Sequence, residues 1–320
     1  MSDQSSPFPT KPFRFGVQLQ SADSGAAWVE QARRVEGLGY DVATIPDHFD
    51  SQFAPVPALQ AILSATTTLR AGALVFDNDY RHPLVLAKEL ATMDVLSDGR
   101  VEIGIGAGWM ISDYEQAGMD YDRAGVRIDR FVEGLAVITG LMADGPFSFD
   151  GDHYTIRDHD GFPKPVQRPR PPVIIGGGGP RVLGLAAREA DIVGVNGTLH
   201  AGVIGPDAIA TMTRDAVVDK VAIVADAART AGRLDHIEMN IRTFFVSVTD
   251  DRDTQVDALS AMIGVDPRMI SESPFALVGD ADEICDTLVA RREEFGFSYV
   301  IVGAGEIDDF APVVARLAGT

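Results

Sequence analysis

The chain has 320 residues, of which 46% are hydrophobic and 23% charged, and its formal net charge is −20. This composition is typical of a soluble globular protein with one large domain or two ordinary ones. The negative charge argues against a nucleic-acid partner, which requires a basic surface, and no apolar run is long enough to cross a membrane.

The first residues and the single cysteine set further limits. Residues 1–12 are polar and rich in proline and serine, without the charged and apolar regions of a secretory signal. We therefore expect a flexible tail followed by one domain at 13–320, in a cytoplasmic protein. With Cys285 as the only cysteine, no internal disulfide can form, and a buried thiol is expected.

Short apolar runs alternate with amphipathic segments along most of the chain. The predicted strands are 13–19, 41–45, 70–76, 101–105, 173–175, 192–195, 238–248 and 298–302. The predicted helices are 25–38, 57–67, 83–96, 122–143, 180–190, 213–231, 254–263, 281–295 and 307–317. Three stretches interrupt this alternation and are predicted to be insertions, the first with a β-hairpin: 144–170, 196–212 and 264–277.

Strands that are apolar throughout are covered on both faces, and helical returns make them parallel. Eight strand–helix units in a chain of this length predict an α/β fold, a (β/α)8 TIM barrel with insertions. A doubly wound open sheet is the alternative.

Two of the predicted strands end in glycines, which let backbone N–H groups approach a ligand closely. The first segment contains Gly104, Gly106, Ala107 and Gly108, and the second contains Gly176, Gly177, Gly178, Gly179 and Pro180. Pro180 suits the first turn of a helix, whose N-terminus favours anions. Neither segment has the spacing of the dinucleotide fingerprint. In a barrel both would lie at the C-terminal rim, where they predict one large phosphate-bearing cofactor.

Other residues at predicted strand ends suggest chemistry. His48 follows Asp47 after the second strand, and an imidazole beside a carboxylate is placed for proton transfer. His48 is therefore the candidate catalytic residue. We expect no metal, because the first strand lacks the His-x-His of barrel hydrolases. Trp109 and Tyr114 are candidate substrate contacts, with loop packing as an equal alternative.

Several of these segments together resemble the bacterial-luciferase-like flavin and deazaflavin oxidoreductases, and most closely the branch that uses coenzyme F-420. The resemblance covers about residues 13–318 and rests on 45–49, 81–83, 93–100, 104–109 and 175–180. It implies a (β/α)8 barrel that is usually dimeric and has a non-proline cis peptide bond, here at Leu74-Val75. It further implies that Asp47 and His48 lie near the reactive edge of the cofactor ring.

The same resemblance implies which residues hold the cofactor. Those near the ring or its tail are Leu74, Val75, Gly106, Ala107 and Gly108, to which we add Asp77 at the end of the third strand. The segment from Gly176 to Pro180 would hold the phosphate through its N–H groups, of which Pro180 itself has none. Trp109 stands where members that oxidise sugar phosphates have a glutamate, so that activity is not expected.

The expected function is hydride transfer between coenzyme F-420 and a small organic substrate. Three alternatives remain open. They are an FMN-dependent monooxygenase of the same family, a non-catalytic flavin- or deazaflavin-binding protein, and a barrel isomerase that handles phosphates without a redox cofactor.

Overall fold

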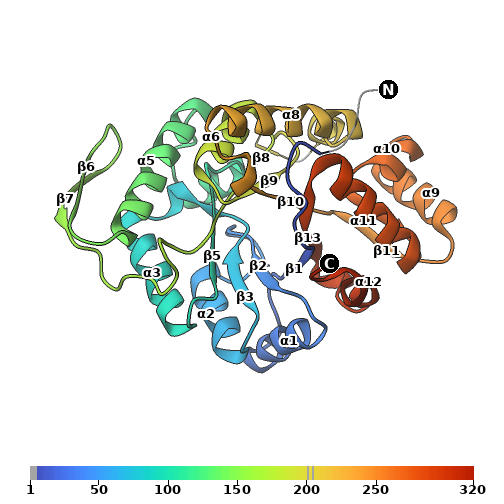
Figure 1. The fold of residues 1–320 in the computed structure, drawn as a ribbon, viewed down its shortest axis with the longest axis horizontal. Coiled ribbons are helices and arrows are strands. Elements are labelled where there is room, and N and C mark those ends of the chain that lie inside the picture. The colour runs from blue at the N-terminus through green and yellow to red at the C-terminus, as the bar shows by residue number, and fades with distance from the viewer. Residues whose placement is uncertain (1–5, 200–201, 204) are drawn as a thin grey trace.

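The computed structural model describes residues 6–199, 202–203 and 205–320. Eight parallel strands form a closed barrel in which each strand pairs with two neighbours and the last pairs with the first (Figure 1). In order around the barrel they are β1 (Arg14–Gln18), β2 (Val42–Ile45), β3 (Arg70–Ala73), β5 (Val101–Gly106), β8 (Val173–Gly177), β9 (Ile192–Val195), β10 (Glu238–Arg242) and β13 (Phe297–Gly303). The TIM-barrel prediction is confirmed, and the alternative of an open sheet is wrong because these strands leave no edge.

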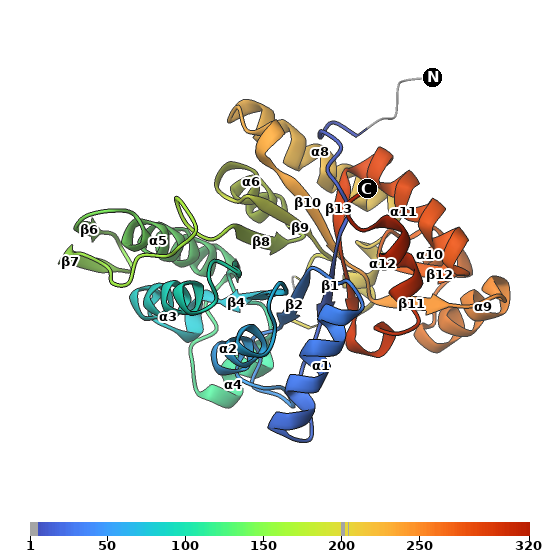
Figure 2. The same cartoon turned by 60° about the horizontal axis from the view of Figure 1, so that its bottom comes forward.

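Helices cover the outside of the barrel (Figure 2). They are α1 (Gly25–Gly37), α2 (Pro55–Ala65), α3 (Pro83–Leu96), α5 (Ala124–Met142), α6 (Pro180–Glu189), α8 (Arg214–Thr230), α11 (Ala281–Phe295) and α12 (Ala311–Leu317). Their ends follow local capping rules. Ser24 accepts a hydrogen bond from the Ala27 N–H at the start of α1. Asp280 and Glu283 form a capping box on α11, and Gly296 ends that helix with a φ of 82°.

Apolar residues fill both sides of the barrel wall. Outward-facing residues such as Val17 and Ile103 pack with the helices in the main core. The inside of the barrel holds a smaller, separate cluster: Val42, Ile174, Ile192, Tyr299 and Ile301. This alternation of inward and outward side chains fixes which residues reach the barrel mouth.

Charged residues occupy the N-terminal end of the barrel interior. Arg14 pairs with Glu102 (2.8 Å) and Glu238 (2.7 Å), and Arg70 pairs with Glu102 (2.9 Å). Burial alone would raise the pKa of Glu102, but the two guanidinium groups hold it below its usual value. Because these charges pair with one another, this end is a structural floor, and ligand chemistry belongs to the opposite, C-terminal end.

The first predicted insertion forms the expected hairpin. β6 (Phe147–Asp150) and β7 (Thr155–His159) pair antiparallel and project away from the barrel near α5 (Figure 1). The second insertion contains the short helix α7 (Pro206–Ala210), and residues 200, 201 and 204 lie outside the described residues.

The strand predicted over 238–248 is in fact two strands. Thr243 directs the chain out of the barrel, and its N–H and hydroxyl both donate to the Ile301 carbonyl (2.9 and 3.0 Å). β11 (Phe245–Val248) then pairs in parallel with β12 (Ala276–Gly279), outside the barrel. α9 (Arg252–Ile263) and α10 (Pro267–Glu272) pack on this pair, so the third predicted insertion contributes a helix and part of a strand.

Part of the segment predicted as a tail packs against the domain, whereas Pro9, Thr10 and Pro12 are exposed. Phe8 is 5% exposed and belongs to the main core, and the Ser6 N–H donates to the Glu293 carbonyl (2.5 Å). Residues 1–5 lie outside the described residues. Cys285 is buried as expected, and burial raises the pKa of its thiol. Every helix in the described part of the chain is too short or too polar to traverse a bilayer.

Candidate active site

The two glycine segments lie side by side at the C-terminal rim of the barrel. They end neighbouring strands, β5 and β8, in which Ile105 stands opposite Ile175. Val75 lies between them, since a Cβ on Gly106 would meet one of its methyl groups at 2.8 Å and a Cβ on Gly176 the other at 3.7 Å. The prediction that both segments share one rim is confirmed.

The wall beside these segments contains the expected cis peptide bond at Leu74-Val75. β3 ends just before it, and the short strand β4 (Phe76–Asp77) follows it and pairs with β5. The Leu74 side chain packs on the cluster inside the barrel, while Val75 contacts the glycine segments. Both candidate ring contacts therefore lie on the wall of the barrel mouth.

Close packing requires several of the glycines independently of any ligand. A side chain at Gly104 would overlap the Ala73 carbonyl oxygen. At Gly108, whose φ is 73°, a side chain would overlap the Asp77 carboxylate and the Tyr114 hydroxyl. Alternating glycines in β5 therefore reflect the close approach of its neighbours as well as access for a cofactor.

The second glycine segment leads into the N-terminus of α6. Gly179 is the N-cap without a side-chain capping bond, and Pro180 is the first helical residue. The N–H groups of a first helical turn have no partner within the helix, so this end favours an anion. Nothing would touch a Cβ on Gly179 within 4 Å, which leaves this side of the segment open. These residues fit a phosphate-bearing group.

His48 is bonded to a buried carboxylate that sequence reasoning missed. Its Nδ1 lies 2.7 Å from Asp113 Oδ2, and the Tyr80 hydroxyl donates to the same oxygen (2.9 Å). The Asp113 side chain is 3% exposed and that of His48 is 19% exposed. With its proton on Nδ1, His48 is oriented by Asp113 and keeps Nε2 as a base.

Asp113 comes from α4 (Ile111–Ala117), a helix that the sequence analysis did not predict. Tyr114 on the same helix is fully buried, and its hydroxyl bonds Asp77 (3.2 Å) and Asp79 (3.0 Å). These bonds anchor α4 to the residues that follow β3. They give no evidence that Tyr114 contacts a substrate. Gly118, which ends the helix with a φ of 66°, was the available sequence signal.

Trp109 is the aromatic neighbour of the candidate base. Its ring packs edge-on against His48, with ring centroids 5.5 Å apart at an interplanar angle of 88°. Its carbonyl accepts a hydrogen bond from the Tyr121 hydroxyl (2.8 Å), which fixes the loop. Trp109 is therefore placed to limit how a substrate approaches His48.

Asp47 braces the loop next to His48. Its carboxylate accepts two hydrogen bonds from Arg81 (2.5 and 3.0 Å) and one from the Asp77 N–H (3.0 Å). The side chain is 2% exposed. Both carboxylate oxygens are thus engaged by protein donors, which makes Asp47 a support of this loop, and the contact between Asp47 and the cofactor stays a prediction.

Asp77 is a buried carboxyl beside Gly108. Burial raises the pKa of Asp77 to about 7, and the neighbouring charges of Asp79 and Asp47 add to the rise, whereas hydrogen bonds from the Asp79 N–H and Tyr114 oppose it. Arg130 neutralises Asp79 from the other side (2.9 Å). Asp77 therefore changes protonation near neutral pH, immediately behind the first glycine segment.

Arg242 and Gln18 bring polar groups to the opposite wall of the barrel mouth. Alternation along β10 puts Arg242 on the same side as Asn240, which donates to the Tyr299 carbonyl (3.0 Å) inside the barrel. Arg242 Nε donates to Gln18 Oε1 (2.6 Å), while its buried Nη1 has no hydrogen-bond partner among the described residues. Burial lowers the pKa of Arg242 to about 10, against a partly compensating effect of Glu306. An unpaired buried donor is costly, so this group is suited to an oxygen of a bound molecule.

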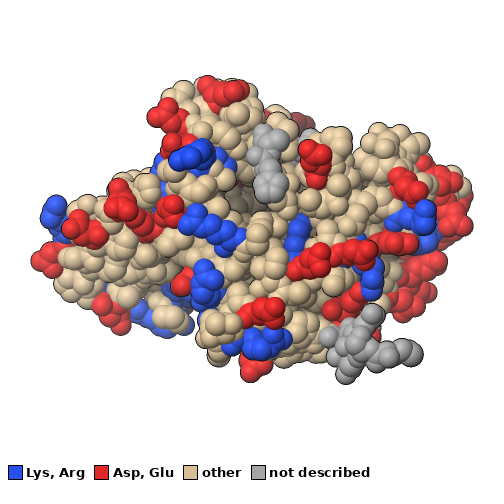
Figure 3. All heavy atoms as spheres, turned by 90° about the horizontal axis from the view of Figure 1, so that it is seen from above, with Lys and Arg blue, Asp and Glu red and all other residues tan. Residues whose placement is uncertain are grey.

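The molecular surface is acidic at one end. In Figure 3, acidic side chains gather over the end of the molecule formed by α9 and α11, and basic and acidic groups mix elsewhere on that face. An anionic cofactor must therefore be held by local donors at the rim. Within the described residues, no three His, Cys, Asp or Glu side chains are grouped as a metal site would need.

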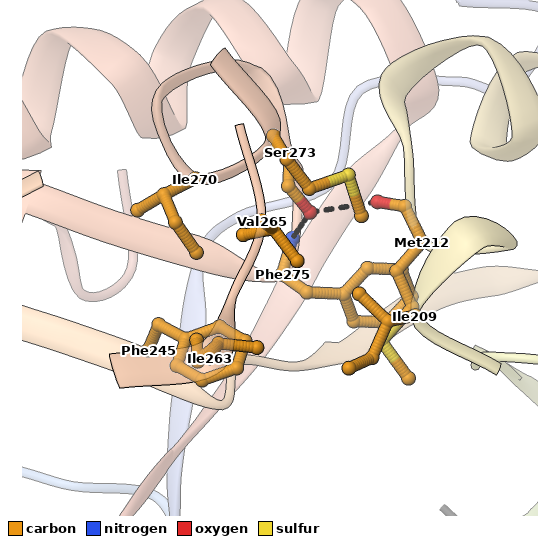
Figure 4. A pocket seen from close by; sticks show the side chains of 9 residues that line it. Ile209, Met212, Phe245, Ile263, Val265, Ile270, Ser273 and Phe275 are labelled. Atoms are coloured by element: carbon orange, nitrogen blue, oxygen red, sulfur yellow. Dashed lines mark hydrogen bonds between the residues drawn. The ribbon is translucent and has the colours of Figure 1, made fainter. Parts of the chain in front are cut away.

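An apolar pocket elsewhere in the fold is a poor candidate for chemistry. It lies beside β11, α9 and α10, where Figure 4 shows its apolar side chains around Ser273. The Ser273 hydroxyl donates to the Met212 carbonyl (2.7 Å) and accepts from the Phe275 N–H (3.2 Å). Its polar group is already used, so the candidate site remains the barrel mouth.

Comparisons with known proteins give relatives of this chain and solved structures with its fold. The model of the luciferase-like monooxygenase family matches residues 10–272. The chain is 26% identical over 247 residues to the FMNH(2)-dependent dimethylsulfone monooxygenase of Pseudomonas putida, covering 77% of this chain and 61% of that protein. It is 30% identical over 191 residues to the F420-dependent glucose-6-phosphate dehydrogenase of Microbacterium testaceum, covering 57% and 56%. The matches thus span less than two thirds of these relatives.

Among solved structures, the coenzyme F420-dependent tetrahydromethanopterin reductase of Methanopyrus kandleri has the same fold. It aligns with a TM-score of 0.78 over 96% of this chain and 99% of that chain, at 21% identity. At this identity the likeness concerns the fold alone.

Proposed function

The chain belongs to the luciferase-like monooxygenase family, and we propose that it is an oxidoreductase that transfers hydride between the deazaflavin coenzyme F-420 and a small organic substrate. The family includes both F420-dependent and FMN-dependent relatives of this chain. The rim residues suit the phosphate of either cofactor, so the choice of F-420 rests on the His48–Asp113 pair, which can exchange the proton that accompanies hydride transfer.

The His48–Asp113 pair is the observation that carries the proposal. When bound, the deazaflavin supplies the carbon that accepts or donates hydride. Oxidation of an alcohol releases the hydroxyl proton as the hydride leaves the carbon, and His48 Nε2 accepts that proton. Asp113, 2.7 Å from Nδ1, stabilises the imidazolium that forms. In the reverse direction His48 returns the proton to the substrate oxygen.

The rim residues divide into three groups by role. The phosphate would be held by N–H groups of the second glycine segment and α6, namely Gly176, Gly177, Gly178, Gly179 and the residues after Pro180. Leu74, Val75, Gly106, Ala107 and Gly108 would support the ring. Trp109 contacts the substrate and restricts water near His48, while Asp47, Asp77 and Tyr114 hold the surrounding loops in place.

An FMN-dependent monooxygenase is the second candidate. It is favoured by the longer match to the FMNH(2)-dependent relative, which covers 77% of this chain against 57% for the F420-dependent one. The N-terminus of α6 suits the single phosphate of FMN as well.

We also propose a homodimer. Large apolar side chains are exposed along α3 and the loop after β7, including Leu96 (64%) and Phe162 (79%). A second copy could cover this surface. Light scattering that gives the mass of two chains supports the dimer, and the mass of one chain overturns it.

Cofactor titration tests the proposed function. Purified protein is mixed with oxidised F-420 or FMN, and quenching of ligand fluorescence is followed. Tight binding of F-420 without FMN supports the proposal. Binding of FMN alone supports the monooxygenase, and binding of neither overturns both.

A further inference from the structure

A buried lysine lies behind the second glycine segment. Lys220, on α8, is 6% exposed, and its Nζ donates to the carbonyls of Asn196 and Thr211 (2.7 Å each). No ion pair of the described residues includes it. Burial lowers the pKa of Lys220 to about 8, so the ammonium is still largely protonated at pH 7.

The Asn196 backbone connects this lysine to the glycine segment. The carbonyl that Lys220 binds is the one that would lie 2.6 Å from a Cβ on Gly178. The Asn196 N–H donates to the Gly177 carbonyl (3.0 Å), and the Thr198 hydroxyl donates to that of Gly178 (3.1 Å). Because α6 and α8 pack side by side (Figure 1), the ammonium lies just behind the segment that leads into α6.

The two carbonyls accept hydrogen bonds from Lys220 but leave its charge unbalanced. Carbonyl oxygens carry only partial charge, and fully buried lysines are rare unless they are paired with a carboxylate. The imbalance is notable in a chain with a net charge of −20, which offers many carboxylates. An anion at the N–H groups of Gly178, Gly179 and α6 would supply the missing negative charge, because electrostatic attraction in a partly buried site acts over several ångströms.

We propose that Lys220 is a positioning residue whose charge strengthens binding of the cofactor's phosphate at the second glycine segment. This inference rests on the proposed function, since it requires a phosphate-bearing cofactor at that rim. It has a specific consequence for ligand affinity. The charge of Lys220 strengthens binding of a ring that carries a phosphate and leaves the affinity for the same ring without a phosphate unchanged.

Two pairs of ligands test this consequence. FMN is compared with riboflavin, and F-420 with its phosphate-free 8-hydroxy-5-deazaflavin chromophore, by fluorescence titration of wild type and Lys220→Met. Methionine keeps the length of the side chain and removes its charge. We expect the variant to bind the phosphate-bearing ligand about tenfold more weakly, equivalent to about 1.4 kcal/mol, and the phosphate-free ring as wild type does.

Lys164 provides a matched control. Its Nζ also donates to two carbonyls, those of Leu141 (3.1 Å) and Ala143 (2.5 Å), but it is paired with Asp160 (2.8 Å). Lys164→Met removes a comparable backbone tether elsewhere and should leave all four affinities unchanged. Lys220→Arg keeps the charge and should retain the wild-type preference for the phosphate within about twofold.

The outcomes separate this inference from the proposed function. If wild type binds neither FMN nor F-420, the proposed function itself fails. If wild type binds one of them and Lys220→Met binds it equally well, the inference is overturned. It is also overturned if Lys220→Met loses affinity for the phosphate-free ring by the same factor as for the phosphate-bearing ligand, because Lys220 is then a structural tether. If Lys220→Met does not fold, Lys220→Arg provides the test. A Lys220→Arg variant that no longer binds the phosphate-bearing ligand more tightly than the phosphate-free ring would overturn the inference.

Discussion

His48 Nδ1 and Asp113 Oδ2 lie 2.7 Å apart, although the two residues are 65 positions apart in the sequence and only His48 comes from a loop, whereas Asp113 lies in a helix. The pair joins the end of β2 to α4 and faces the same rim as both glycine segments. This site and the packing around it lead to four predictions.

Replacing His48 by alanine should lower kcat by a factor of about 10²–10⁴, because the group that exchanges the substrate proton is lost. The dissociation constant of the cofactor should stay within about twofold. Steady-state kinetics and cofactor titration measure the two effects separately. His153→Ala, at an exposed hairpin position, is the control. Equal turnover in the His48 variant would refute the proton-transfer role of His48.

Replacing Asp113 by asparagine should lower kcat by about 10–100-fold and leave the KM for substrate and the cofactor affinity nearly unchanged. Asparagine keeps the shape of the side chain but can no longer stabilise an imidazolium. Tyr80→Phe removes only a neutral donor to the same oxygen (2.9 Å) and should cost less. A larger loss in Tyr80→Phe than in Asp113→Asn would contradict this order.

Replacing Asp77 by asparagine should stabilise the protein at pH 8 and have little effect at pH 4. Burial raises the pKa of Asp77 to about 7, so the folded state binds this proton more tightly than the unfolded state. The stabilising contribution of the protonated form is complete below about pH 4 and is lost as the pH rises through 7. Urea unfolding at the two pH values should show a gain of about 2–4 kcal/mol at pH 8 only. A destabilised variant at pH 8 would show that the ionised carboxylate is needed.

Replacing Gly104 by alanine should destabilise the fold by about 2–4 kcal/mol, because the new methyl group overlaps the Ala73 carbonyl oxygen in the barrel wall. Gly37, which is exposed in α1 and has no atom within 4 Å of where a methyl group would lie, is the matched control. Gly37→Ala should be neutral or stabilising by up to about 1 kcal/mol. Thermal unfolding compares the two, and similar midpoints would refute the packing argument.

Apolar patterning was sufficient to predict the barrel, because a parallel strand covered on both faces must be apolar along its whole length. The same rule led to the wrong prediction that β10 and β11 form one strand. The two segments are separated by only two residues and each carries inward or outward apolar side chains, and only the pairing of β11 with β12, some 30 residues later in the chain, takes β11 out of the barrel.

Side-chain direction at the rim could not be predicted in the same way. Asp47 and Tyr114 follow predicted strand ends in the sequence, yet their side chains support the loops. Asp47 is bonded to Arg81, and Tyr114 is bonded to Asp77. Asp113 acquires its role from His48, and α4, which carries it, is too short to show a periodic pattern. Arg242 and Lys220 became candidates only when burial showed which of their atoms or charges lack a partner.

A crystal structure of the protein with F-420 would test directly whether the cofactor binds at the barrel mouth. We expect the phosphate to accept hydrogen bonds from N–H groups between Gly177 and Val182, and the ring to lie over Val75 with its reactive carbon beside His48. A cofactor bound away from the barrel mouth, or with its phosphate at another strand end, would show that the proposed site is wrong.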